Sequence, residues 1–124
     1  MTFNSPIPVL RSFDKSMVQE FYIDFLSFAQ DWCHKPDDKS PIYMQLSKGK
    51  CVLHLSEHFG DAAPGMTLRI PVDDLNAFHS ELISKQYKNA RSGLNEMPWG
   101  VEMPVSDPFG NRLIFFQASP SSGL

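Results

Sequence analysis

The chain has one histidine whose position invites a chemical role. His54 lies inside an apolar stretch, residues 51–57, that has the composition of a strand. An imidazole there can serve as an acid or base, contact a bound ligand, or be a neutral, hydrogen-bonded side chain of the core or a cleft. All three roles fit the sequence, and the neighbours that the fold supplies must decide between them.

Aromatic side chains recur in or beside the strand-like segments. Four of them could form the walls of a binding site: Trp32, Tyr43, Trp99 and Phe116. Such rings offer flat surfaces for a heteroaromatic or cationic ligand, although plain core packing also explains them. Trp99 is the strongest candidate, because proline and glycine flank it where a polar loop meets a strand. Acidic residues that could attract a cation lie nearby in the sequence: Glu57, Glu96 and Glu102.

Other chemistries find little support. Cys33 and Cys51 form no CxxC pair and have no histidine at zinc-finger spacing, so we expect small buried thiols in a reducing compartment. The acidic pairs at 37–38 and 73–74 fit a turn and a helix cap better than a catalytic acid pair. No glycine-rich phosphate loop and no nucleophile elbow is present.

Composition narrows the class of protein. The 124 residues, of which 42% are hydrophobic, suffice for one folded domain, and the net charge is −3. Without a run of Lys or Arg, nucleic acid is a poor partner. No signal-peptide core or membrane-length apolar run is present, so we expect a cytoplasmic protein that does not engage a membrane.

The first half of the chain predicts a strand, a helix and three strands. The strands are expected at 5–11, 28–35, 42–46 and 51–57. The helix should begin with a capping box, Ser16 with Gln19, and end near Ser27. Its apolar face has Val18, Phe21 and Phe25. Residues 58–65 are predicted to be a linker.

The second half repeats this order. Strands are expected at 66–72, from Tyr87, at 101–105 and at 113–117, with a polar loop at 92–98 and a flexible tail at 118–124. Asp73 should cap the helix, whose apolar face has Leu75, Phe78 and Leu82. The helix faces of the two halves match at an offset of 57 residues, and the closing strands match at 60. The chain is therefore predicted to be a single α+β domain of two βαβββ modules, about 5–57 and 66–117.

Three strings resemble motifs of the glyoxalase/bleomycin-resistance (vicinal oxygen chelate, VOC) superfamily, and in particular its bleomycin-resistance branch. They are Phe21-Tyr22 with Phe25-Leu26 and Phe28, Val72-Asp73-Asp74-Leu75, and Trp99-Gly100 with Asp107-Pro108-Phe109-Gly110-Asn111. The likeness runs from about Ile7 to Gln117. Ser27 departs from it, since glycine is usual there.

The resemblance implies two half-barrels that shape a cleft, and in the family's enzymes four His, Gln or Glu side chains hold a divalent metal in it. Here the corresponding positions fall at Ile7, His54, Thr67 and Ile114. One ligand of four does not hold a metal, so we expect no metal and no cofactor.

Two classes of function follow from the resemblance. The first is sequestration of a cationic, bleomycin-type glycopeptide antibiotic by a homodimer, which would confer antibiotic resistance. Its expected contacts are Trp32, Tyr43, His54, Trp99, Glu102 and Phe116. The second is an isomerase or lyase with a metal-free site, using His54 and Glu102 as acid and base. A small-molecule carrier or sensor would use the same site as the first.

Overall fold

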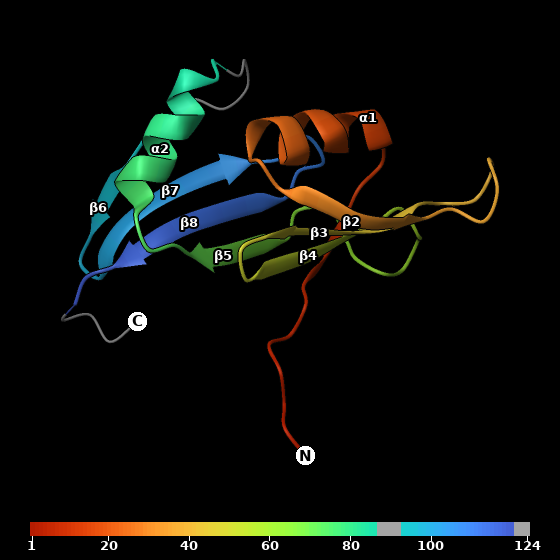
Figure 1. Cartoon of the computed structure of the whole chain (residues 1–124), viewed down its shortest axis with the longest axis horizontal. Coiled ribbons are helices and arrows are strands. Elements are labelled where there is room, and N and C mark those ends of the chain that lie inside the picture. The colour runs from red at the N-terminus through yellow and green to blue at the C-terminus, as the bar shows by residue number, and fades with distance from the viewer. Residues whose placement is uncertain (87–92, 121–124) are drawn as a thin grey trace. The chain divides into compact units, whose positions relative to one another are not determined.

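A computed structural model describes residues 1–86 and 93–120 of the chain. The chain divides into two compact units, Met1–Pro64 and Gly65–Leu124. Each unit contains one strand, one helical segment and three further strands in sequence order, joined into a four-stranded mixed sheet. The predicted α+β class and the predicted repeat of strand, helix and three strands are both confirmed (Figure 1).

Unit 1 contains strands β1 (Val9–Arg11), β2 (Ala29–His34), β3 (Tyr43–Lys48) and β4 (Cys51–Ser56). They lie in the order β1-β4-β3-β2, with β1 parallel to β4 and the other pairs antiparallel. Helix α1 (Lys15–Val18) continues into a π-helical segment, η1 (Gln19–Phe25), and Figure 1 shows the helix along one side of these strands.

The sheet of unit 1 has one apolar face. Alternate residues of its strands are almost wholly buried, as are aromatic residues of the helix: Leu10, Met44, Leu46, Leu53, Leu55, Phe21, Tyr22 and Phe25. Successive side chains of a strand point to opposite faces, so the residues between them, Val9, Gln45 and His54, share the other face. These three are only half-buried. The second face is therefore the one that can bear a site.

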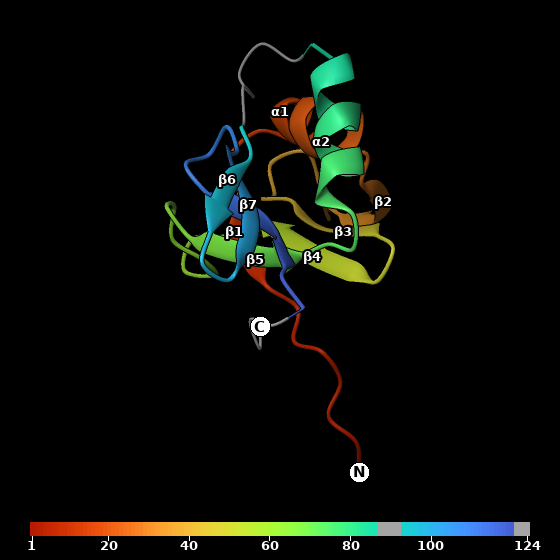
Figure 2. The same cartoon turned by 90° about the vertical axis from the view of Figure 1, so that its left-hand side faces the viewer.

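Unit 2 contains β5 (Thr67–Pro71), α2 (Leu75–Ser84), β6 (Asn95–Met97), β7 (Gly100–Ser106) and β8 (Arg112–Ala118). The strand order is β5-β8-β7-β6, with β5 parallel to β8. The helix packs on one face of the sheet, where the ring of Phe78 meets that of Phe115 edge-on at 4.9 Å. Figure 2, turned by 90°, shows α2 to the right of β6 and β7.

One predicted element of unit 2 is wrong, and another lies outside the described residues. The strand expected from Tyr87 falls on residues 87–92, which the structure does not describe. Residues 92–98 were expected to be a loop, but Asn95–Met97 pair with β7 as an edge strand. A segment of three residues is too short to show alternation. Whether it forms a strand depends on the partner strand rather than on its own sequence.

Both predicted helix caps are wrong as well. Asp14, not Ser16, accepts hydrogen bonds from the backbone N–H groups of the first turn, and the Ser16 hydroxyl itself donates to Asp14. Asp74, not Asp73, caps α2. A carboxylate in extended backbone next to the first turn satisfies its free donors better than a side chain already inside it. The observed caps are 60 residues apart, the same offset as the closing strands.

The helical segment of unit 1 ends at a left-handed residue. Ser27 has a φ of 65°, and its N–H donates to the carbonyl of Ile23. Glycine adopts this conformation without steric cost, which explains why the related motif usually has glycine here. No helix in the described part of the chain has the length and apolar character that a membrane span needs.

Candidate functional site

The site in unit 1 begins with an irregularity in strand β2. Gln30 pairs with Leu46, but the next residue to pair, with Gln45, is Trp32, so Asp31 is an extra residue. A bulge of this kind bends the strand and re-aims neighbouring side chains. As a result, the Asp31 carboxylate reaches back over β3, where it accepts hydrogen bonds from Gln45 Nε2 at 3.0 Å and Ser47 Oγ at 2.9 Å.

Three of the predicted site residues meet on this face. The rings of Trp32 and Tyr43 are stacked, with centroids 5.9 Å apart and planes within 12°. His54 meets both rings edge-on, at 5.4 Å from Trp32 and 5.2 Å from Tyr43. Trp32 remains 42% exposed, so a flat aromatic surface with fixed neighbours is open to solvent. We call Trp32, Tyr43 and His54 the aromatic cluster.

A chain of hydrogen bonds runs beneath the aromatic cluster. The Asp31 carboxylate only accepts, so the Gln45 amide turns its Nε2 toward Asp31 and its Oε1 toward His54 Nε2, 3.0 Å away. His54 must then carry its proton on Nε2. In neutral His54 the Nδ1 lone pair accepts from the Tyr43 hydroxyl at 2.7 Å. These hydrogen bonds thus assign the His54 tautomer from Asp31, which is two hydrogen bonds away.

Tyr43 keeps its proton over an extended pH range. Burial, and then the negative charge of Asp61, raise the pKa of the Tyr43 hydroxyl above its ordinary value. The hydroxyl therefore remains a neutral donor toward His54. The ring of His58 lies 6.3 Å from that of Tyr43.

The described residues do not fit a divalent metal. Both ring nitrogens of His54 are taken by Tyr43 and Gln45, which leaves no lone pair for coordination. The neighbour of His54 in β1 is Val9, whose side chain also offers no lone pair. In the described residues, no three His, Cys, Asp or Glu side chains are grouped in a way that could hold a metal ion.

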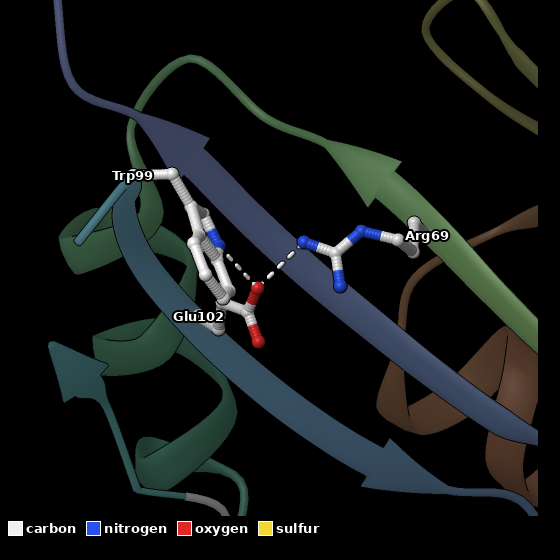
Figure 3. Close-up of polar contacts among 3 residues, drawn as sticks. All are labelled: Arg69, Trp99 and Glu102. Carbon is white, nitrogen blue, oxygen red and sulfur yellow. Dashed lines mark hydrogen bonds and ion pairs between the residues drawn. The ribbon is translucent and has the colours of Figure 1, made fainter. Parts of the chain in front are cut away.

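The corresponding face of unit 2 is built around Glu102. Its Oε2 accepts a hydrogen bond from Trp99 Nε1 at 2.6 Å and forms an ion pair with Arg69 Nη2 at 2.5 Å. Figure 3 shows both groups converging on this oxygen. These two donors hold the pKa of the Glu102 carboxyl below its ordinary value, Arg69 contributing most, while burial opposes the shift. Glu102 is therefore ionised and already paired.

Phe116 completes this group. The Arg69 guanidinium carbon lies 4.8 Å from the centre of the Phe116 ring, and Phe116 is the cross-strand neighbour of Glu102. The structure thus brings Trp99, Glu102 and Phe116 together within unit 2. We call Arg69, Trp99, Glu102 and Phe116 the Arg69 cluster.

Several side chains of these faces were missed from the sequence. Asp31 and Gln45 had no recognisable signal, because a bulge and an amide orientation depend on strand register. Arg69 had one signal, because strand alternation puts it on the same face as Thr67 and Pro71, and in the sheet it lies beside Ile114.

The remaining candidates have structural roles or lie apart. Glu57 accepts from the backbone N–H of Ile42 at 3.0 Å and so extends the pairing at the open end of the β3–β4 hairpin. Cys33 and Cys51 are free thiols, and both are half-buried rather than buried as predicted. Burial raises the pKa of the Cys51 thiol, which lowers its reactivity. Glu96 lies on the short edge strand β6 and is exposed.

Comparison with protein families identifies the class. A protein-family model described as "Glyoxalase superfamily protein" matches residues 1–121. The chain therefore belongs to the glyoxalase superfamily. No curated protein matches it.

Solved structures extend the comparison over nearly the whole chain. A bleomycin-binding protein from bleomycin-producing Streptomyces verticillus, complexed with copper(II)-bleomycin, is 27% identical with a TM-score of 0.71, covering 96% of this chain and 99% of that one. An antibiotic-binding protein, TnmS3, from Streptomyces sp. CB03234 is 21% identical with a TM-score of 0.73, over 96% and 99%. A bleomycin resistance determinant encoded on transposon Tn5 is 23% identical with a TM-score of 0.73, over 94% and 99%. The fold is thus that of the bleomycin-resistance proteins.

Proposed function

We propose that this protein is a metal-independent small-molecule-binding protein that sequesters a cationic, heteroaromatic antibiotic of the bleomycin type. The observation that carries the proposal is the exposed Trp32–Tyr43 stack beside the Asp31 carboxylate. A heteroaromatic ring can stack on the outer face of Trp32, and a cationic group can lie against Asp31.

The aromatic cluster is organised before a ligand arrives. The Trp32 ring is stacked on that of Tyr43 and meets that of His54 edge-on, and hydrogen bonds join Tyr43 to His54 and His54 to Gln45. Binding then costs little side-chain ordering. An aromatic contact of this type contributes about 0.5–1.5 kcal/mol beyond burial, and a cation over an indole contributes a further ~0.5–2 kcal/mol.

The relatives support the same class of ligand. The Streptomyces verticillus protein binds bleomycin and shares 27% of its residues with this chain. The antibiotic-binding TnmS3 and the Tn5 resistance determinant share its fold. At these sequence identities the antibiotic itself can differ between relatives. The proposed ligand class therefore rests on the chemistry of the site, which is aromatic stacking next to a carboxylate.

The proposal is tested by titrating bleomycin into the protein in a calorimeter. We expect Trp32→Ala to weaken binding at least about tenfold, from lost stacking and burial. Asp31→Asn should weaken binding and reduce its dependence on salt. Phe59→Ala is the control, because Phe59 is an aromatic residue of the same unit that is 97% exposed and outside the cluster. Equal losses for Trp32→Ala and Phe59→Ala, or no binding of bleomycin or phleomycin by the parent, contradict the proposal.

A second candidate, a metal-free isomerase or lyase, rests on the 2.7 Å hydrogen bond between Tyr43 and His54. This pair could move a proton to or from a substrate. Glu102, the other residue considered from the sequence, is a poor base because its two donors lower its pKa. An enzyme predicts that Tyr43→Phe binds a ligand but no longer converts it, whereas a binding protein, carrier or sensor releases every ligand unchanged.

A further inference from the structure

Arg69 presents a fixed cation on the face of unit 2 that lies opposite α2. Its guanidinium lies over the ring of Phe116 and is tied to Glu102 through Nη2. In Figure 3 the guanidinium extends from β5 toward the Glu102 carboxylate, with its other terminal nitrogen directed away from the pair. Two separate contacts thus fix both the plane and the direction of this group.

The ion pair is exposed unequally. The side chain of Arg69 is 42% exposed, whereas that of Glu102 is 12% exposed. The pair therefore acts as a dipole whose negative end is covered and whose positive end faces solvent. Arg112 adds a second positive charge that acts on Glu102, and it lies on the same face of β8 as Ile114, the neighbour of Arg69.

The guanidinium has donors to spare. It carries five N–H groups in a planar fork, which matches the two oxygens of a carboxylate. Among the residues that the structure describes, only its Nη2 has a hydrogen-bond partner. The face of the guanidinium opposite Phe116 can also stack on a flat ring. One group therefore offers hydrogen bonds at its edge and a stacking surface above it.

We infer that the Arg69 cluster is a binding subsite for an aromatic carboxylate. The ligand's ring stacks on the outer face of the Arg69 guanidinium, and its carboxylate takes the unused N–H groups. Glu102 and Phe116 are positioning residues that keep the guanidinium flat and aimed. This subsite does not depend on the proposed function, because it lies in the other unit and attracts the opposite charge.

The competing explanation is a purely structural ion pair that clamps β5 to β7 across the intervening strand β8. A clamp and a subsite differ in what a small anion does. A purely structural ion pair does not bind a carboxylate from solution. A subsite binds it, and binds it more tightly than a neutral molecule of the same shape.

The test compares 2-naphthoate with its neutral analogue 2-naphthamide, titrated calorimetrically at low salt. We expect the parent to bind naphthoate at least about tenfold more tightly, since charge-assisted hydrogen bonds of this type contribute more than neutral ones. The double variant Arg69→Gln/Glu102→Gln should lose that preference, although it leaves the net charge of the chain unchanged. Arg112→Gln, which removes one positive charge but leaves the Arg69 cluster intact, should weaken naphthoate binding less than about threefold.

Two results would overturn the inference. One is a parent protein that does not prefer naphthoate, and the other is a folded double variant that still does. If the double variant does not fold, Arg69→Lys decides, because it keeps the charge and an ion pair with Glu102 but loses the fork and the flat surface. An Arg69→Lys variant with undiminished preference also overturns it. Bleomycin and naphthoate are separate probes, so either proposal can fail while the other stands.

Discussion

Replacing Trp99 by Phe isolates one hydrogen bond of the Arg69 cluster. The substitution keeps an aromatic ring but removes the indole N–H that donates to Glu102 Oε2 at 2.6 Å. A hydrogen bond to a charged group contributes about 1.5–3 kcal/mol to stability. Arg69 still pairs with the same oxygen after the change, so the loss should be near the lower end of that range. We expect Trp99→Phe to lower the free energy of unfolding by about 2 kcal/mol.

Urea denaturation followed by circular dichroism measures this value without relying on tryptophan fluorescence. The cycle of Trp99→Phe, Glu102→Gln and the double variant should give a coupling energy of about 1–2 kcal/mol, because the two side chains touch. Trp32→Phe is the matched control. Trp32 is 42% exposed, and within the described residues its indole N–H makes no hydrogen bond, so its replacement should cost under about 0.5 kcal/mol.

The reasoning fails if the coupling energy is below about 0.5 kcal/mol, the level at which separate sites are additive. It also fails if the two Trp→Phe variants are equally destabilised, since ring size alone would then explain both. Should Trp99→Phe instead bind 2-naphthoate more weakly with unchanged stability, Trp99 would be a ligand contact rather than a positioning residue.

Four further predictions follow from other features. Ser27→Gly should raise the free energy of unfolding by about 1 kcal/mol, because Ser27 has a φ of 65°; a urea titration that shows a loss would contradict this. Because the folded state lowers the pKa of Glu102, its stabilisation is present above the ordinary value of 4.5 and lost as pH falls below it. Unfolding measured from pH ~6 to pH ~3 should therefore show a steeper loss for the parent than for Glu102→Gln. Sedimentation should reveal a homodimer that covers the edge strands, and a 14.0 kDa species at micromolar concentration would count against it. Elemental analysis should find no stoichiometric divalent metal, and a metal lost on His54→Ala would show the interpretation of His54 to be wrong.

The site was partly predictable because half of it follows strand alternation. Tyr43 and His54 lie in strand segments whose side chains alternate between the two faces, and both fall on the less buried face. Trp32 joins them only through the bulge at Asp31, which the sequence did not indicate. Trp99 was singled out by its flanking proline and glycine. Glu102 was predicted to contact a ligand or to serve as an acid or base, and the sequence could not show that its carboxylate is paired, since its partner Arg69 is 33 residues away.

What the sequence by itself determined is the repeated order of elements, the apolar faces of the helices and the family. These depend on local periodicity and short motifs, which are visible along the chain. Only the tertiary structure decided which groups bond to each other. The bulge at Asp31 orients the Gln45 amide, which assigns the His54 tautomer. Strand β8 pairs with both β5 and β7, and this pairing brings Arg69 close enough to Glu102 to form an ion pair. Such contacts depend on the register between strands that are distant in sequence, and register is set by the packing of the whole sheet rather than by any local run of residues.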